Sequence, residues 1–336
     1  MIIGIIKEIF PGETRVAATP ATAGIFTNKG FKLLVEAGAG QAAGFPDTAY
    51  QKTGAVICKT AAEILPQTDI LLKIKAPVSD EIALLRRRSL LIGDLQNLTQ
   101  PQLKELRDKN ICAFALERLP RISRAQPFDI LSSQNNLAGY QAVIKSLVLG
   151  NRIAPLMITS AGTIPPLKFL IIGVGVAGLQ AIATAKRLGG KVFASDPRPE
   201  VKEQVTSLGA EFLPDFQLLL PQVDVIITAA LTTERKAPKI ITGKLLKKLS
   251  PGTVLIDMAS DRGGNIESSL DNRIIRTENV IIYGGSLLAA EVPTTASMLF
   301  ANNLCNFILQ FYSAGQKAFV PDSGDPLITS TCLLKG

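Results

Sequence analysis

The chain has 336 residues, of which 47% are hydrophobic and 19% are charged, and its net charge is +8. This length exceeds what one hydrophobic core usually holds, so we expect two domains. The composition excludes a disordered or low-complexity protein. Aromatic residues make up only 5% and tryptophan is absent, which argues against nucleic-acid binding despite the positive charge.

The chain contains no histidine and four widely spaced cysteines. Without histidine, the commonest general base and metal ligand is missing. The cysteines form no C-x-x-C pair and therefore predict neither a zinc site nor a disulfide framework. We expect a protein of the reducing cytosol whose chemistry uses neither imidazole nor metal.

In chain order, the first half alternates short apolar runs with helical patterns. Residues 1–6 are apolar and are followed by Lys7 and Glu8, which predicts a buried first strand rather than a signal peptide. Further buried strands are predicted at 32–36, 70–74, 89–92 and 111–115. The basic run at 86–88 is interpreted as a solvated helix face.

The second half repeats this alternation. A helix predicted over 131–150 leads to strands at 167–172, 191–195, 223–229, 254–258 and 280–283. A second helix starts at Pro293, with Thr294 or Thr295 able to cap it, and returns the chain to the first domain. We predict an α/β protein with two Rossmann-like, doubly wound parallel-sheet domains joined by long connecting helices. The N-terminal domain would comprise 1–133 with 306–336, and the Rossmann domain 134–305.

The strongest motif is a G-x-G-x-x-G formed by Gly173, Gly175 and Gly178, between a predicted strand and a predicted helix. Gly173 would allow a tight turn, Gly175 a close approach of a pyrophosphate, and Gly178 close packing of helix on strand. The helix beginning near Val176 would offer free N–H groups to the phosphates. The same stretch, 169–185, is almost long enough to span a membrane, but its three glycines argue otherwise.

An acidic residue follows at the end of the next predicted strand. Asp196 lies close to the roughly 20-residue spacing at which a carboxylate accepts both ribose hydroxyls of NAD and repels a 2′-phosphate. Arg198 leaves two alternatives open, because a nearby arginine can accept NADP and can equally be an exposed turn residue. The motif predicts NAD(H) as the cofactor, with a purely structural turn as the alternative.

These motifs resemble those of a known superfamily. Residues 173–196 resemble the second signature shared by alanine dehydrogenases and transhydrogenase α subunits, with departures at Val174 and Gly190. Residues 7–20 are similar to the core of the first signature, although Ile6 replaces the usual proline. The likeness covers nearly the whole chain.

Two branches of this superfamily differ in chemistry. Alanine dehydrogenases use an arginine and a lysine for the substrate and a histidine as acid and base. Arg15 and Lys75 match the first two, whereas Gln96 stands where the histidine aligns. Because glutamine does not exchange a proton near neutral pH, oxidative deamination is not expected. Arg15 and Lys75 would then be inherited loop structure.

The segment 120–134 closely resembles the transhydrogenase loop that carries an Arg, a Gln and an Asp. The resemblance implies that Arg121, Gln126, Asp129 and Ser132 hold the nicotinamide end of the cofactor and face the second nucleotide. Direct hydride transfer needs no acid, base or metal, because the hydride carries both electrons. The alternative is a polar cap of the following helix, with Asp129 or Ser132 accepting from free N–H groups.

The resemblance implies the NAD(H)-binding subunit of a proton-translocating NAD(P) transhydrogenase, with Leu231 lining the cofactor pocket. Hydride would pass directly between NAD(H) on this chain and NADP(H) on a partner. No segment can span a bilayer, so proton translocation would need separate NADP(H)-binding and membrane-spanning subunits. The chain would be a homodimer on the cytoplasmic face of the inner membrane and would bind no nucleic acid. The alternatives are an alanine dehydrogenase-like amino-acid oxidoreductase and a non-catalytic NAD-binding protein.

Two segments depart from the transhydrogenase pattern. The connection 212–223 is short where these proteins commonly carry a mobile loop that closes over NAD(H), and such loops govern water exclusion and release. Residues 284–293 lack the usual aromatic residue and Pro-Ser-Arg. Binding of the nucleotide is therefore implied more strongly than turnover.

Overall fold

The computed structural model describes residues 1–232, 236–277, 279–316 and 318–334. The chain forms two compact units, Met1–Gln134 with Val292–Gly336, and Asn135–Glu291. The sequence placed the return to the first domain at residue 306, whereas the first unit resumes at Val292. The reason is that helix α10 (Pro293–Gln310) packs into the first core along its length, through Phe300, Leu304 and Phe307.

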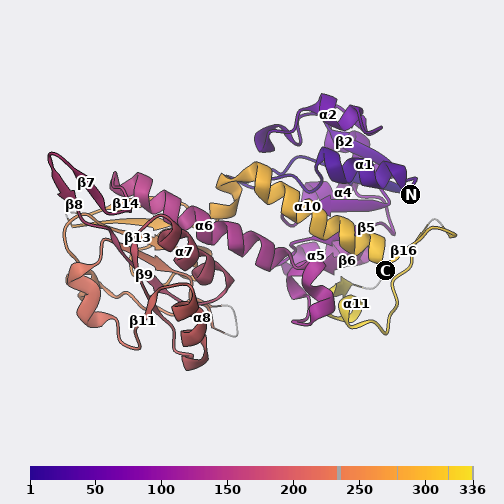
Figure 1. Cartoon of the computed structure of the whole chain (residues 1–336). Coiled ribbons are helices and arrows are strands. Elements are labelled where there is room, and N and C mark those ends of the chain that lie inside the picture. Colours follow the sequence, from indigo (N-terminus) through magenta and orange to yellow (C-terminus); the bar gives the residue numbers. More distant parts are fainter. Residues whose placement is uncertain (233–235, 278, 317, 335–336) are drawn as a thin grey trace. The chain divides into compact units, whose positions relative to one another are not determined.

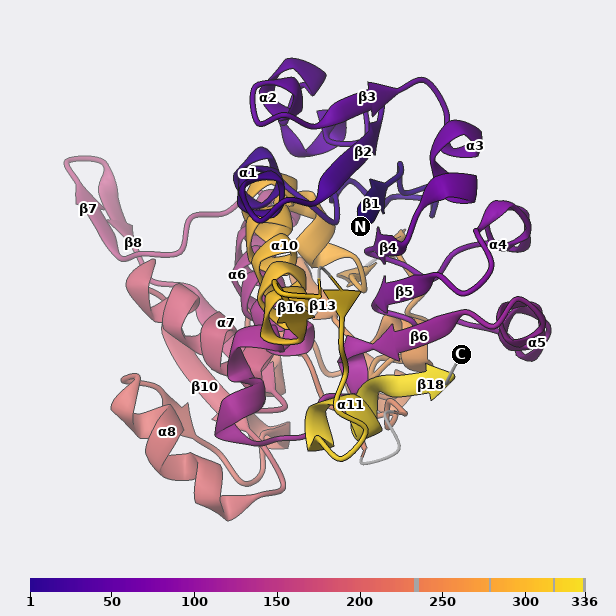
Figure 2. The ribbon, with the colours of Figure 1, turned by 90° about the vertical axis from the view of Figure 1, so that its right-hand side faces the viewer.

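The first unit is built on a seven-stranded sheet in the order β18-β6-β5-β4-β1-β2-β3. Its strands are β1 (Ile2–Ile5), β2 (Lys32–Glu36), β3 (Val56–Cys58), β4 (Ile70–Lys73), β5 (Leu90–Gly93), β6 (Cys112–Ala115) and β18 (Cys332–Leu334). All pair in parallel except β18, which runs antiparallel beside β6 (Figure 2). The strand order reverses between β1 and β4, which is where α/β sheets bind ligands at the carboxyl ends of their strands.

Alternate residues of these strands enter two cores on opposite faces. One face is covered by α1 (Pro20–Asn28), α10 and α11 (Pro326–Thr331), and the other by α3 (Ala61–Ile64), α4 (Ser79–Leu84) and α5 (Gln100–Asp108) (Figure 2). The remaining elements of this unit are η1 (Gln41–Ala43), α2 (Asp47–Gln51), η2 (Leu65–Gln67), η3 (Leu116–Arg118), η4 (Ser123–Phe128), β16 (Tyr312–Ser313) and β17 (Ala318–Phe319).

The expected threonine cap of α10 is wrong. The helix begins after Val292 with Pro293 in its first turn and has no side-chain cap. The Thr294 hydroxyl instead donates a 2.8 Å hydrogen bond to the carbonyl of Ala43. Proline suits the first helical position because its missing N–H would have no partner there.

The second unit contains a sheet in the order β11-β10-β9-β12-β13-β15-β14. Figure 1 labels β14, β13, β9 and β11 of this sheet. Its strands are β9 (Lys168–Ile172), β10 (Lys191–Ser195), β11 (Glu211–Phe212), β12 (Val225–Thr228), β13 (Thr253–Asp257), β14 (Ile274–Arg276) and β15 (Val280–Gly284). Only β14 is antiparallel to its neighbour among these. The order reverses between β9 and β12, so this sheet too has a switch point.

Helix α6 (Ile130–Gly150) starts in the first unit and continues into the second. Within the second unit it covers one face of the sheet together with α7 (Val176–Arg187) and α8 (Lys202–Ser207). The other face is covered by η6 (Gln217–Gln222), α9 (Gly243–Leu246) and the buried loop residues Ile241, Leu249 and Ile266. The remaining elements are β7 (Met157–Thr159), β8 (Gly162–Ile164), η5 (Pro199–Val201), η7 (Ser260–Arg262) and η8 (Leu288–Glu291). The structure confirms the predicted fold of two Rossmann-like α/β domains.

The apolar stretch 169–185 forms part of β9, the glycine turn and most of α7. Across the part of the chain that the structure describes, no helix combines the length and apolar character needed to cross a bilayer.

Candidate functional site

The glycine turn joins β9 to α7 at the switch point of the second sheet. Gly173 has φ +95°, and a Cβ there would lie 2.8 Å from the carbonyl carbon of Ala229. A Cβ on Gly178 would lie 2.0 Å from the carbonyl oxygen of Gly173. Glycine is therefore required at both positions, once for backbone conformation and once for close packing of α7 on the turn.

Gly175 differs from these two glycines. A Cβ built there would meet no described atom within 4 Å, and the backbone angles, φ −92° and ψ −165°, suit any residue. Gly175 is the N-cap of α7, and no side chain caps the helix. The N–H groups of the first turn of this 12-residue helix, at its positive end, therefore have no capping side chain among the described residues. This arrangement fits the pyrophosphate of a dinucleotide.

Asp196 follows β10, beside the glycine turn. Its Oδ2 accepts from the backbone N–H of Val174 at 2.7 Å and from Nη2 of Arg198 at 3.0 Å. Its Oδ1 accepts from the backbone N–H and Nε of Arg198 at 3.0 and 2.9 Å. Burial opposes ionisation of this carboxyl, but the hydrogen bonds from Arg198 outweigh burial and hold its pKa below the ordinary value.

The carboxylate accepts four hydrogen bonds within the chain, so a ribose hydroxyl would reach it only by replacing part of its bonding to Arg198. The Arg198 side chain is half-exposed and folds back onto Asp196 and the carbonyl of Val174. Its charge is matched by the carboxylate, which leaves it less available to a 2′-phosphate than an unpaired arginine would be. Asp196 and Arg198 therefore act as one unit.

Sequence reasoning missed two residues that shape the neighbouring strand end. Asn265 is fully buried, accepts from the N–H of Ala230 at 3.0 Å and donates to its carbonyl at 2.9 Å. Asp257, at the end of β13, accepts from the N–H groups of Asn265 and Ile266 at 3.1 Å. Both hold the chain next to Leu231, whose side chain is half-exposed. The available signal was the likeness to the superfamily, which covers nearly the whole chain and so includes Asn265.

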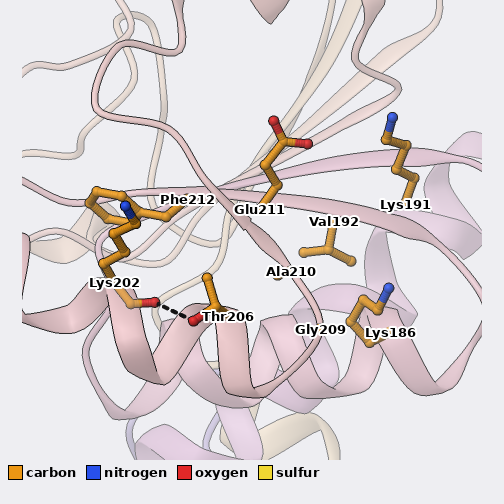
Figure 3. A pocket seen from close by; sticks show the side chains of 9 residues that line it. All are labelled: Lys186, Lys191, Val192, Lys202, Thr206, Gly209, Ala210, Glu211 and Phe212. Atoms are coloured by element: carbon orange, nitrogen blue, oxygen red, sulfur yellow. Dashed lines mark hydrogen bonds between the residues drawn. The ribbon is translucent and has the colours of Figure 1, made fainter.

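A hollow of about 440 Å³ in the same unit lies elsewhere (Figure 3). The hollow lies at the end of α7 and the beginning of β10, whereas the glycine turn lies at the carboxyl end of β9 and the beginning of α7. It is lined by Lys186, Lys191, Val192, Lys202, Thr206, Gly209, Ala210, Glu211 and Phe212. The glycines of the turn are not among the residues that line this hollow.

The predicted nicotinamide residues lie in the first unit, in the loop around η4 and at the start of α6. Asp129 accepts from the N–H of Ser132 at 2.9 Å and from its hydroxyl at 2.5 Å. Asp129 thus caps α6, as the capping interpretation predicted. Arg121 and Gln126 are exposed, and their side chains form no hydrogen bond with residues that the structure describes. Two of the four residues are fixed, and two are available to a ligand.

The residues that match an alanine dehydrogenase site are engaged internally. The buried guanidinium of Arg15 donates to both carboxylate oxygens of Glu13, at 2.7 and 2.6 Å, and to Gln134 at 2.7 Å. Lys75 lies 3.6 Å from Asp94, which also accepts from the Gln96 amide at 3.2 Å. Each cation is thus matched by a carboxylate of the chain itself. Among the described residues, no cluster of Cys, Asp and Glu could hold a metal ion.

Comparisons with known proteins place the chain in a family. Residues 4–138 match the family model "Alanine dehydrogenase/PNT, N-terminal domain", and residues 142–335 match the corresponding C-terminal domain. The chain is 40% identical to an NAD(P) transhydrogenase subunit alpha of Rhodospirillum rubrum, covering 100% of this chain and 96% of the relative. An alanine dehydrogenase of Methanococcus maripaludis is 29% identical, covering 100% of this chain and 92% of the relative.

Among solved structures, a transhydrogenase from Sinorhizobium meliloti superposes with a TM-score of 0.94 at 38% identity, covering 100% of this chain and 99% of that one. The alignment with the Rhodospirillum rubrum relative extends over 370 positions, whereas this chain has 336 residues. That relative therefore contains segments that have no counterpart here. The chain belongs to the alanine dehydrogenase/PNT family, and within it to the NAD(P) transhydrogenase alpha subunits.

Proposed function

We propose that this chain binds NAD(H) at the glycine turn of its second unit and exchanges hydride directly with NADP(H) held by a partner subunit. The observation that carries the proposal is the uncapped start of α7 with open space at Gly175. Open space and free N–H groups at this position suit two phosphates and serve no evident packing purpose. Relatives named as transhydrogenase subunits support the same conclusion.

In this proposal Gly173, Gly175, Val176 and Gly178 receive the pyrophosphate. Asp196 and Arg198 share the ribose, since a ribose hydroxyl can reach the carboxylate only by replacing part of its bonding to Arg198. The negative carboxylate disfavours a 2′-phosphate and so selects NAD(H). Leu231, half-exposed beyond β12, supplies apolar lining.

Arg121, Gln126, Asp129 and Ser132 are proposed to hold the nicotinamide end. The nicotinamide supplies the hydride chemistry when bound, and the protein orients the ring and excludes water. Arg121 and Gln126 are exposed donors for the carboxamide and ribose. Asp129 and Ser132 are held by their own cap. No side chain has to exchange a proton, which is consistent with a chain that lacks histidine.

The fold also suggests how copies of the chain associate. The hairpin of β7 and β8 exposes large apolar side chains, including Ile158 at 73% and Ile164 at 45%. Apolar side chains grouped in this way indicate a protein interface, and we propose that the hairpin contributes to a homodimer. Ile158→Asp should shift the chain toward monomer in sedimentation experiments. An unchanged dimer, or a wild-type monomer, would contradict this assignment.

The NADP(H)-binding and membrane-spanning functions are proposed to reside on other subunits, which would hold this chain on the cytoplasmic face of the inner membrane and couple transfer to proton translocation. Co-purification with a membrane subunit tests the association. Recovery of the chain free of membrane proteins under gentle extraction would count against it.

The catalytic test mixes the purified chain with an NADP(H)-binding transhydrogenase component and follows reduction of an NAD analogue by NADPH. A parallel reaction contains NADH, pyruvate and ammonium but no partner. Transfer only in the mixture supports the proposal, whereas activity in the parallel reaction selects an amino-acid dehydrogenase. NADH binding without transfer in either reaction selects a non-catalytic binding protein.

The variant Asp129→Asn tests the nicotinamide loop separately from folding. Asparagine caps helices about as well as aspartate, so stability should be retained. Slower transfer with an unchanged melting temperature supports a role at the nicotinamide. A wild-type rate of hydride transfer would mean that Asp129 only caps α6 and has no role at the nicotinamide.

A further inference from the structure

The buried side-chain amide of Asn303, on α10, is hydrogen-bonded both to η4 and to the first turn of α6. Asn303 is 8% exposed. Its Nδ2 donates to the carbonyl of Pro127 at 2.8 Å, and its Oδ1 accepts from the hydroxyl of Ser133 at 2.8 Å. Pro127 directly follows Gln126, and Ser133 directly follows Ser132. The two hydrogen bonds therefore enclose Asp129 and border the exposed Gln126.

A polar side chain at this position is unexpected from packing alone. The neighbouring helix positions Phe300, Leu304 and Phe307 are all buried in the apolar core. An amide buried there weakens the fold unless both its donor and its acceptor are satisfied. Both are satisfied here, by groups on two consecutive elements, η4 and α6. Such bonding fixes a geometry that apolar packing would leave less defined.

The same helix face holds the loop by packing. The ring of Phe128 meets that of Phe307 edge to face, with centroids 5.9 Å apart. An ion pair of 2.7 Å joins Arg124 to Asp325, but the Arg124 side chain is half-exposed and the pair therefore contributes little. The hydrogen bonds of Asn303 restrict the orientation of the loop, whereas ring packing alone would allow the loop to slide.

We propose that Asn303 is a positioning residue for hydride transfer. It does not touch the reacting atoms in this account. It sets the path of the backbone from Gln126 to Ser132 and thereby the orientation of the residues assigned to the nicotinamide. The second part of this inference rests on the proposed function, whereas the anchoring of the loop can be measured without it.

The test compares Asn303→Leu with a matched control, Asn302→Leu. Leucine has a similar volume, and each freed group keeps another partner, since Asn306 also donates to the Pro127 carbonyl at 3.3 Å and Ser133 also donates to Ile130 at 3.1 Å. The Asn303 variant should therefore fold. Asn302 is the adjacent residue of α10, is exposed, and makes no side-chain hydrogen bond to the described residues.

Three quantities are measured on each protein: hydrogen exchange of the amides in 121–132 by mass spectrometry, the dissociation constant for NADH, and kcat in the mixed transfer assay. For Asn303→Leu we expect exchange in this loop to become roughly tenfold faster, the factor given by one lost hydrogen bond of ordinary strength. We expect kcat to fall by about tenfold to a hundredfold, the effect of a small misplacement of reacting groups. The dissociation constant for NADH should change by a smaller factor than kcat, because the pyrophosphate and adenosine are assigned to the second unit.

A purely structural role predicts a different pattern, in which kcat falls only as far as the fraction of NADH-binding protein falls.

Asn303→Asp separates the two hydrogen bonds, since it keeps the acceptor for Ser133 and loses the donor to Pro127. It should share the fast exchange and low kcat of the leucine variant.

Unchanged loop exchange in Asn303→Leu would overturn the anchoring. Fast exchange with an unchanged kcat would overturn the catalytic consequence, as would equal effects in Asn302→Leu. If the wild-type chain transfers no hydride, the proposed function fails, and the exchange comparison still decides whether Asn303 anchors the loop.

Discussion

The variant Gly175→Ala tests the nucleotide site without disturbing the fold. The added methyl would meet no described atom within 4 Å, and the backbone angles of Gly175 suit alanine. Replacing glycine by alanine reduces the conformational entropy of the unfolded chain and so stabilises the fold by about 0.4–1 kcal/mol. Alanine is a poorer N-cap than glycine, and this costs a similar amount. The free energy of unfolding should therefore hardly change.

Binding of NADH should change strongly, because the methyl occupies the space assigned to the phosphates. Displacing one charge-assisted hydrogen bond between a phosphate oxygen and the start of α7 costs about 1.5–3 kcal/mol, which raises the dissociation constant by roughly 10- to 150-fold. A fluorescence titration with NADH measures this constant, and circular dichroism follows thermal unfolding.

Gly178→Ala provides the contrast in the same motif. Its methyl would lie 2.0 Å from the Gly173 carbonyl oxygen, so the variant should lose about 1–3 kcal/mol or more of stability as α7 is pushed off the turn. A folded Gly175→Ala protein that binds NADH as tightly as the wild type would refute the placement of the pyrophosphate.

Three other predictions concern individual polar and charged side chains. Asp196→Ser removes the carboxylate that neutralises Arg198. Binding titrations should therefore show the ratio of NADPH affinity to NADH affinity rising by about tenfold or more. An unchanged ratio would mean that Asp196 does not contact the ribose. Burial opposes ionisation of Glu13, but Arg15 outweighs it and holds the pKa of Glu13 low. The pair therefore stabilises the fold above the unfolded pKa of about 4.3, and this stabilisation is lost as the pH falls through the lower folded value. Glu13→Gln should lower the free energy of unfolding by about 3–5 kcal/mol at pH 7. Denaturant titrations near pH 3 should show a smaller difference in the free energy of unfolding between this variant and the wild type, and a difference that does not change with pH would contradict this prediction. Because Gln96 cannot act as an acid, NADH with pyruvate and ammonium should show no oxidation, and a measurable rate would argue against that reasoning.

The long buried strands could be predicted from the sequence because each is a continuous apolar run. The predicted runs 32–36 and 191–195 coincide with β2 and β10, and the ends of the others lie within two residues of the observed ends. In the two seven-stranded sheets, β3, β11, β14 and β18 were not predicted. They are short and lie at the edges of their sheets, where part of each strand is exposed and the apolar pattern is weak.

The site was predictable where it depends on local backbone and not where it depends on contacts distant in sequence. The roles of Gly173 and Gly178 could be assigned from their spacing alone, because the order of glycines in the motif indicates the tight turn at Gly173 and the close helix packing at Gly178. The bonding of Arg198 to Asp196 was not foreseen, because a motif specifies residue types and not side-chain directions. Asn303 gave no signal at all, since its partners at Pro127 and Ser133 are far away along the chain.

Direct transfer of hydride between two nucleotides is the central claim, and isotope transfer tests it most directly. NADPH carrying deuterium at the transferred position of C4 is supplied to the chain and an NADP(H)-binding component in ordinary water, and the reduced NAD analogue is analysed by mass spectrometry. If hydride passes directly between the nucleotides, the deuterium appears in the reduced NAD analogue. Reduction without the label would mean that a carrier or a solvent proton intervenes, and direct transfer would be contradicted.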